Sequence, residues 1–319
     1  MAGPAIDGAD VVVYRDAAKH SMVAQKSLNG KGKRNKSLFV AGTSQNSKKQ
    51  AGLRQMLVVL KSNYEELSQE AARIVATSVR QNPEVRLGLA TGSTTIGVYR
   101  ELARLHREEA LDFSRVVTFN LDEYLGISPE HPQSFHHFMR EHFFSRVNLD
   151  ARNIHIPDGT ISGDYEKYCA GYEAEIQRAA GIDLQILGIG RNGHIGFNEP
   201  TSSFASKTRL KVLSKATVED NRKFFGAGEK MPRLAITMGI GTILASRRVL
   251  MLATGAAKAG AVANAIEGPL TASVTASALQ LHPDATAILD EGAAALLKQK
   301  DYYRDVMEMT ALFTPGKLS

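Results

Sequence analysis

The stretch LQILGIGRNGHIGFNEP, residues 184–200, decides how this chain folds. Its first four residues are mainly apolar and predict a buried strand, and the glycines after them predict a loop. That loop places His194 five residues before Glu199. In parallel α/β sheets, ligands bind just beyond the carboxyl ends of the strands. A histidine there, beside a carboxylate, is equipped to move protons at neutral pH. A glycine turn with a surface histidine and glutamate is the alternative.

Units of strand and helix recur on both sides of this stretch. Predicted strands cover residues 85–90, 115–120, 183–190, 248–254 and 285–289, and predicted helices cover residues 62–80, 95–106, 134–147, 218–225, 258–266 and 291–300. No hairpin dipeptide separates the strands, so we expect right-handed crossovers and a mainly parallel sheet. The sequence predicts a single α/β domain, a three-layer sandwich with a doubly wound, Rossmann-like sheet.

Four predicted strand-to-helix turns follow from this architecture. They cover residues 91–95, 121–126, 188–200 and 254–258. Because the carboxyl ends of parallel strands meet at one edge of a sheet, we expect the four turns to share one crevice.

The net charge of +6 does not mark a nucleic-acid-binding face. Residues 1–50 contain nine Lys/Arg and three Asp, which leaves 30 basic and 30 acidic residues in the remainder. We therefore expect residues 1–55 to be a basic, disordered extension and residues 56–319 to hold the α/β domain. A tether to nucleic acid or another anionic surface stays open as the role of the extension, but a nucleic-acid partner is not the favoured interpretation.

The remaining composition indicates a cytoplasmic protein. Hydrophobic residues make up 43% of the chain, and no apolar run approaches the roughly 18 residues that span a bilayer. One cysteine, Cys169, excludes an internal disulfide framework and fits a reducing compartment. No membrane association is expected.

The first turn has the features of an anion site. It joins a strand to a helix N-terminus, where free N–H groups and the helix dipole favour negative charge. The residues concerned are Thr91, Gly92, Ser93 and Thr94. The turn matches neither a Walker A loop nor G-x-G-x-x-G, so a phosphate monoester fits it better than a nucleotide. Many such turns bind nothing, which is the alternative.

The second and fourth turns carry charged side chains. Asp122 and Glu123 follow an apolar strand, so one of them is a candidate base for a carbon-bound proton; capping of the next helix or a lysine pair is the alternative. Lys258 lies where it can reach an anion in the shared crevice, and Lys223 adds a second cation.

Metal and serine-hydrolase chemistry find little support. Four histidines fall within residues 131–142, yet there is no His-Glu-x-x-His and no cysteine pair, so exposed helix histidines are the favoured interpretation. No G-x-S-x-G elbow is present. We expect neither a metal site nor an organic cofactor.

With all four turns considered, the chain resembles the glucosamine-6-phosphate deaminase (isomerase) family. The resemblance runs from about residue 57 to residue 300. Its most specific parts are residues 88–92, 118–126, 130–135 and 188–200.

The resemblance implies a role for individual residues. Asp122 resembles the proton-transfer base, His194 the ring-opening acid/base and Glu199 the carboxylate that orients it. Asn192 stands where some members have aspartate. Matches to substrate-binding positions are Thr91, Gly92, Ser93, Thr94, Glu123, Lys258 and Lys223, the last in place of a usual arginine.

A second set of residues resembles a regulatory site. Ser202, Arg209 and Lys211 match the phosphate ligands of an allosteric site for N-acetylglucosamine 6-phosphate in some members. That site lies at subunit contacts, so a homo-oligomer is one expectation; the resemblance leaves a hexamer and a monomer both open.

The implied reaction converts D-glucosamine 6-phosphate and water to D-fructose 6-phosphate and ammonia, in amino-sugar catabolism. The partner is then a small hexosamine phosphate. A 6-phosphogluconolactonase-type hydrolase and a non-catalytic sugar-phosphate sensor are the alternatives. The Phe-Asn-Glu-Pro run at residues 197–200 favours the deaminase, and residues 1–55 offer no helix-turn-helix for a sensor.

Overall fold

The computed structural model describes residues 56–226 and 228–313. The expected extension, residues 1–55, lies outside these described residues.

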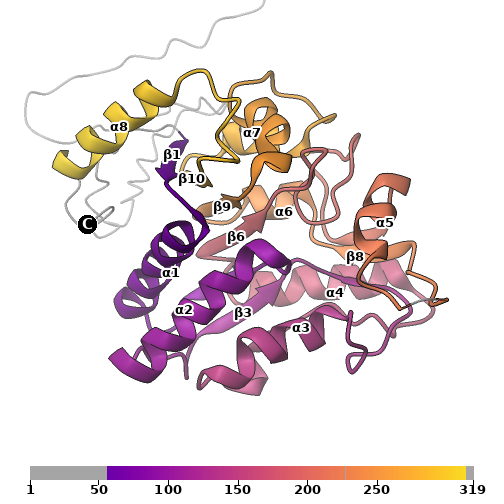
Figure 1. The fold of residues 1–319 in the computed structure, drawn as a ribbon. Coiled ribbons are helices and arrows are strands. Elements are labelled where there is room, and N and C mark those ends of the chain that lie inside the picture. Colours follow the sequence, from indigo (N-terminus) through magenta and orange to yellow (C-terminus); the bar gives the residue numbers. More distant parts are fainter. Residues whose placement is uncertain (1–55, 227, 314–319) are drawn as a thin grey trace, which may run out of the picture. The chain divides into compact units, whose positions relative to one another are not determined.

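A seven-stranded parallel sheet forms the centre of the fold (Figure 1). Its strands, in spatial order, are β1 (Leu57–Lys61), β10 (Ala285–Asp290), β9 (Val249–Ala253), β6 (Leu184–Gly188), β2 (Arg86–Leu89), β3 (Val117–Asn120) and β5 (Ile154–His155). Every pairing in this sheet is parallel. The predicted parallel α/β sheet is confirmed, and its middle strands are buried on both faces, as their apolar sequences require.

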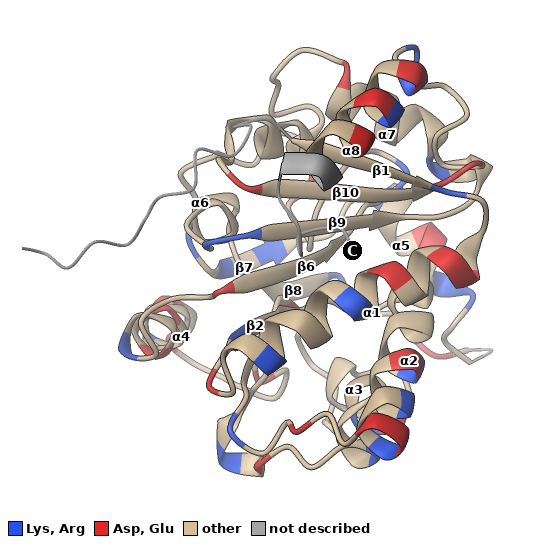
Figure 2. Ribbon diagram, turned by 90° about the vertical axis from the view of Figure 1, so that its left-hand side faces the viewer, with Lys and Arg blue, Asp and Glu red and all other residues tan. Residues whose placement is uncertain are grey.

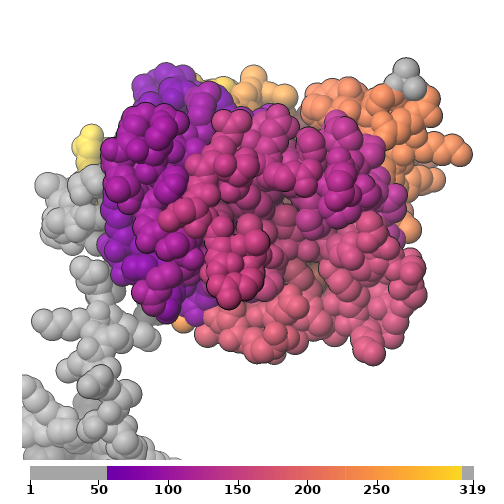
Figure 3. Space-filling view, turned by 90° about the horizontal axis from the view of Figure 1, so that it is seen from below, coloured from indigo at the N-terminus to yellow at the C-terminus, as the bar shows by residue number. Residues whose placement is uncertain are grey.

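Helices cover both faces of the sheet and complete the three layers. One face packs against α1 (Tyr64–Gln81), α2 (Ser93–Glu109) and α3 (Phe135–His142), and the other against α4 (Tyr165–Arg178), α6 (Ile240–Leu244) and α7 (Ala259–Ile266). Helix α8 (Lys300–Phe313) contacts β1 at the sheet edge. Seen from below, the magenta segment that carries α3 lies beside the pink segment that carries α4 (Figure 3). The orange segment that carries α5 projects at one side (Figure 3).

Local sequence sets the start of α1. The Asn63 side chain accepts a hydrogen bond from the Glu66 N–H at 2.9 Å, and the Ser62 N–H donates to the Glu66 carboxylate at 3.2 Å. These contacts satisfy helix N–H groups that have no partner within the helix. The helix then buries a stripe that includes Leu67, Ala71 and Val75 against the sheet.

A second, antiparallel sheet was not predicted. It consists of β4 (Asp122–Tyr124), β8 (Leu234–Thr237) and β7 (Arg209–Val212), with α5 (Lys215–Arg222) between β7 and β8. The prediction of a loop over residues 121–126 is therefore wrong. The strand has only three residues, and the partner that gives it extended geometry lies more than 100 residues later in the chain.

The helix predicted over residues 291–300 is also wrong. The segment 291–298 forms turns, and α8 begins only at Lys300. The Asp290 carboxylate accepts from the Ala293 N–H at 2.7 Å, while Glu267 accepts from the N–H groups of Lys298 and Gln299. Asp290 thus caps the first turn of the segment, whereas Glu267 takes the N–H groups of Lys298 and Gln299 that a helix over residues 291–300 would have used. Short 3₁₀ turns occur elsewhere, namely η1 (Phe144–Arg146), η2 (Ala151–Asn153), η3 (Ala256–Lys258) and η4 (Thr275–Leu281).

Charges are mixed on the surface of the described residues. Basic and acidic residues both occur along α1 and α2 (Figure 2), and many are paired, as Arg104 is with Glu101. Over the described residues, no helix is both long and apolar enough to cross a membrane.

Candidate active site

Four neighbouring strands bring the predicted turns together. The strands β9, β6, β2 and β3 are adjacent and parallel, so the turns that follow them lie in a row at one edge of the sheet. The four turns were placed on one edge from sequence alone, and the structure confirms that placement.

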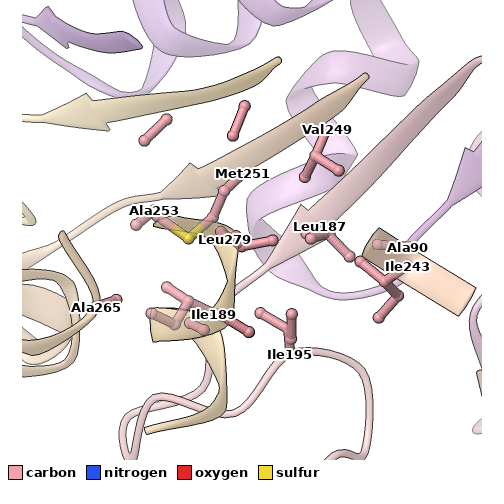
Figure 4. Packing of buried hydrophobic residues seen from close by; sticks show 14 of the residues in the cluster. Ala90, Leu187, Ile189, Ile195, Ile243, Val249, Met251, Ala253, Ala265 and Leu279 are labelled. Carbon is pink, nitrogen blue, oxygen red and sulfur yellow. The ribbon is translucent and has the colours of Figure 1, made fainter. Parts of the chain in front are cut away.

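The Gly–His loop, residues 188–200, is folded tightly and anchored in the core. The Gly190 N–H donates to the His194 carbonyl at 2.8 Å, and the Gly193 N–H donates to the Gly190 carbonyl at 3.0 Å. Ile189 and Ile195 flank this turn, and both point into the core (Figure 4). Apolar anchors on both sides hold the histidine at a fixed place above the sheet edge.

The His194 ring lies directly over Gly190. A Cβ added at Gly190 would stand 2.3–2.5 Å from the ring atoms, so only glycine leaves room for the imidazole. Burial lowers the pKa of the His194 imidazole below its ordinary value. Lys258 lowers this pKa further, while Glu199 and Asp220 oppose the shift.

Glu199 and Asn192 form the polar support of this histidine. The Glu199 Oε2 atom lies 3.8 Å from His194 Nδ1 and accepts from the Asn192 side-chain amide at 3.1 Å. Asn192 also accepts from the His194 backbone N–H, at 3.2 Å. Burial raises the pKa of Glu199, but the Thr217 hydroxyl, the Ser214 N–H and His194 outweigh it, so the pKa lies below its ordinary value.

Asp122 is a strongly perturbed carboxylate in this crevice. It begins β4, where it pairs with Thr237 of β8, and its side chain is buried. Burial, assisted by the charge of Glu123, raises the pKa of Asp122 to about 8. Its Oδ2 atom lies 3.4 Å from where a Cβ of Gly196 would stand, so it packs against the Gly–His loop.

Glu123 meets different surroundings, although it was predicted to bind substrate. Its carboxylate accepts from the N–H groups of Phe135 and His136, at 2.8 and 3.1 Å, and contacts His136 Nδ1 at 3.0 Å. A carboxylate at these N–H groups caps the N-terminus of α3. The structure therefore gives Glu123 a capping role, which was the alternative interpretation of this carboxylate pair.

The first turn presents the N-terminus of α2. Gly92 has φ +112° and is the N-cap, and no side chain in the described part of the chain caps this end. Ser93 is exposed and Thr94 half-buried, which leaves their hydroxyls free to meet a ligand. The Tyr64 hydroxyl donates to the Ser93 carbonyl at 2.9 Å and ties this turn to α1.

Lys258 brings a cation to the same edge. It follows Gly255, whose N–H donates to the Asp290 carboxylate at 2.9–3.0 Å, so Asp290 shapes this turn. Burial lowers the pKa of the Lys258 ammonium. Asp220 opposes that shift and Lys223 adds to it, so both side chains lie within electrostatic reach.

A family model described as glucosamine-6-phosphate isomerases/6-phosphogluconolactonase matches residues 61–288. The chain belongs to this family. A relative named glucosamine-6-phosphate deaminase, from Thermoanaerobacter pseudethanolicus (strain ATCC 33223 / 39E), is 50% identical over 246 residues, which are 77% of this chain and 97% of the relative. Another with that name, from Shewanella loihica (strain ATCC BAA-1088 / PV-4), is 48% identical over 251 residues, 79% of this chain and 93% of the relative.

Solved structures agree with membership of the glucosamine-6-phosphate isomerase/6-phosphogluconolactonase family. A monomeric glucosamine-6-phosphate deaminase matches with a TM-score of 0.74 and 45% identity, over 76% of this chain and all of that one. A 6-phosphogluconolactonase from Trypanosoma brucei matches with a TM-score of 0.59 and 21% identity, over 76% of this chain and 99% of that one. The second likeness shows the shared fold.

The second set of predicted residues is divided between the segment after Glu199 and the strand β7. Ser202 is buried and donates to the Glu199 carbonyl at 2.7 Å. Arg209 and Lys211 are two apart on β7 and therefore share one face. Burial lowers the pKa of Arg209, whose Nη2 atom is buried with no hydrogen-bond partner among the described residues.

The prediction of exposed helix histidines over residues 131–142 is wrong, because all four are half-buried and His131 precedes α3. His131 Nε2 lies 2.5 Å from Glu229, and His136 contacts Glu123, so each has a carboxylate partner. Within the described ranges, no group of three or more His, Cys, Asp and Glu side chains is arranged to hold a metal ion.

Sequence reasoning missed Arg191 and Asp220. Arg191 stands between Gly190 and Asn192, and its Nε atom lies 2.9 Å from Asp220 Oδ2 on α5. The two are 29 residues apart, so only the folded chain reveals the pair. The one available signal was a basic residue between the glycines of the loop, at Gly190 and Gly193.

Proposed function

We propose that the protein converts D-glucosamine 6-phosphate and water to D-fructose 6-phosphate and ammonia, as its relatives are named to do. One observation carries this most strongly. A buried aspartate whose pKa is raised to about 8, Asp122, packs against the loop that carries His194. A strong base and a titratable imidazole thus face one crevice, as proton transfer between neighbouring sugar atoms requires.

Ring opening comes first in the proposed reaction. His194 takes the proton of the C1 hydroxyl and gives one to the ring oxygen, which breaks the C1–O5 bond and forms the aldehyde. Its lowered pKa favours the neutral imidazole, which can accept that proton at neutral pH. Asn192 donates a hydrogen bond to Glu199 within the loop, and the Glu199 carboxylate places a negative charge near the His194 ring.

Isomerisation and deamination follow. The Asp122 carboxylate removes the C2 proton to form an enolamine and returns it to C1, which leaves an imine at C2. Water adds to this imine and ammonia leaves, giving the ketose. None of these reaction steps needs an external oxidant or reductant.

The phosphate anchors the sugar during these steps. The N-terminus of α2, with Thr91, Gly92, Ser93 and Thr94, supplies N–H groups and hydroxyls, and Lys258 and Lys223 supply positive charge. Binding energy from the phosphate positions C2 at Asp122. Glu123 contributes indirectly, by capping α3 and by raising the pKa of Asp122.

We further propose a regulatory anion site at Ser202, Arg209 and Lys211, with N-acetylglucosamine 6-phosphate as its ligand. A buried guanidinium nitrogen without a partner in the described residues is a ready donor for a phosphate. We place the enzyme in the cytoplasm because its one cysteine, Cys169, is free. We place it in N-acetylglucosamine catabolism because its relatives are named glucosamine-6-phosphate deaminase.

The test is release of ammonia and fructose 6-phosphate from glucosamine 6-phosphate by the wild type and by Asp122→Asn and His194→Ala. Asp122→Asn is expected to lower kcat by at least ~10³-fold. Asp301→Asn, at an exposed helix position, is the matched control and should keep full activity. Folded wild-type protein that releases no ammonia but hydrolyses 6-phosphogluconolactone would overturn the proposal.

A further inference from the structure

Arg191 of the Gly–His loop and Asp220 of α5 form a bidentate ion pair. Arg191 Nε lies 2.9 Å from Asp220 Oδ2, and Nη2 bonds Oδ1. The side chains are 60% and 34% exposed, and an ion pair this exposed contributes little to stability. Its bidentate geometry, however, adds directional specificity that a single contact lacks, so it orients one face of α5 against the loop that carries His194.

Lys223 lies on that same face. It is three residues after Asp220, and residues three apart on a helix are neighbours. Its Nζ atom also lies 5.0 Å from the centre of the Phe224 ring, which is 54% exposed. A lysine is a point charge on a flexible stem, so its position depends on restraints of this kind.

Arg191 and Lys258 lie on the turns that follow two paired strands, β6 and β9. Burial lowers the pKa of Lys258, Asp220 opposes this, and Arg191 and Lys223 reinforce it, so these three charges lie within electrostatic reach of Lys258. Three cations and one carboxylate give this group a net charge of +2. A phosphate monoester carries about −1.5 to −2 at neutral pH, so the two charges match.

We propose that Arg191 and Asp220 form a charge clamp that holds α5 against the Gly–His loop and positions Lys223 beside Lys258 to bind a phosphate monoester. The proposal rests on the proposed function for the identity of the sugar. Both residues are positioning residues: they place the cation that binds the anion, and they do not act on the reacting carbon atoms.

Asp220→Ala separates the clamp from simple electrostatics because the two predict opposite signs. Removing a carboxylate raises the net charge of the group to +3, which by charge alone would strengthen anion binding. Loss of the clamp instead frees Lys223. We expect Asp220→Ala and Arg191→Ala each to raise KM for glucosamine 6-phosphate by ~10-fold with kcat within ~2-fold of wild type.

The double variant Arg191→Asp/Asp220→Arg restores the pair with its charges exchanged. A clamp predicts that KM returns to within ~3-fold of wild type, because the group keeps its net charge and α5 its anchor. Failure of this rescue, or tighter binding in Asp220→Ala, would overturn the clamp. Arg115→Ala, which removes the pair that a similarly exposed arginine forms with Glu84, is the control and should leave KM unchanged.

Binding of inorganic phosphate, measured by calorimetry, supplies a readout that does not depend on turnover. The same order of affinities is expected: both single variants weaker than wild type, and the exchanged pair close to it. If the wild type releases no ammonia and phosphate affinities still follow this order, the proposed function fails and the clamp stands. If ammonia is released and the affinities do not change, the clamp alone is wrong.

Discussion

The Asp122 and Glu123 carboxylates are adjacent in the chain and meet different parts of the molecule. The Asp122 carboxylate packs against Gly196 of the Gly–His loop, and that of Glu123 accepts N–H donors at the start of α3. Side chains alternate faces along a strand, so β4 separates two adjacent acids into two environments. One carboxylate has its pKa raised to about 8, while the other caps a helix.

The buried Asp122 carboxylate is expected to lower the free energy of unfolding, while its raised pKa makes it a stronger base. Its folded pKa is about 8 against an ordinary value of 3.8, so stability present below pH 3.8 is lost as pH rises toward 8. At pH 8 the free energy of unfolding of Asp122→Asn should therefore exceed that of wild type by on the order of a few kcal/mol, so the variant should unfold at a higher temperature. Near pH 4 the two proteins should be equally stable. Thermal unfolding of both proteins at both pH values measures this difference. Equal stability of wild type and variant at pH 8 would show that burial of the charged Asp122 carboxylate does not destabilise the fold.

Glu123→Gln should move the pH profile of kcat/KM to lower pH. The charge of Glu123 helps to raise the pKa of Asp122, so its removal lowers the pH at which the Asp122 base form appears. The variant should also lose about 1–3 kcal/mol of stability, because α3 loses a charged cap. A rate profile from pH 5 to 10 measures the shift; movement of the lower limb to higher pH would contradict this assignment.

Gly190→Ala should displace the His194 ring. The added Cβ would stand 2.3–2.5 Å from the ring atoms, so the imidazole must turn away. We expect kcat to fall by ~10²-fold with the fold intact, since a small misplacement of a catalytic group is costly. Gly171→Ala is the matched control: this exposed helical glycine has open space around it, and alanine there should preserve activity and add up to about 1 kcal/mol of stability.

Lys258→Gln should weaken phosphate binding more than it slows chemistry. The side chain is half-buried near Asp220 and Lys223, where its charge is poorly screened by solvent. We expect KM to rise by ~10–100-fold, and the dependence of KM on salt to become shallower. Lys167→Gln, at an exposed position on α4, should change neither quantity. Steady-state rates at low and high salt make this measurement.

The sequence predicted those parts of the fold that local pattern determines. Strands such as β6 and β9 are apolar runs that must be buried, and their order with helices indicates a parallel sheet. The four turns followed from that order, and with them the positions of Asp122, His194 and Lys258. Once the ends of the strands are predicted, the residues that lie at the edge of the sheet are known, and with them the candidate catalytic groups.

Features that depend on distant pairing escaped prediction. The strand β4 is three polar or aromatic residues, and only its pairing with β8 makes it a strand. Residues 291–298 are rich in alanine, yet Glu267, which lies 31 residues before Lys298, takes N–H donors that a helix would need. The Arg191–Asp220 pair likewise joins two segments that no local pattern relates.

The pairing of β1 with β10 has a consequence for how the protein is made. Among the described residues, the strand β1, the first in this sheet, pairs only with β10, the last. A ribosome releases residues 57–61 long before residues 285–290, so this edge of the sheet cannot close until synthesis is almost finished. The base on β4 also waits for residues 234–237. We therefore expect a nascent chain that lacks these later strands to be inactive. Shortened products that stop before β10 should be degraded by proteases.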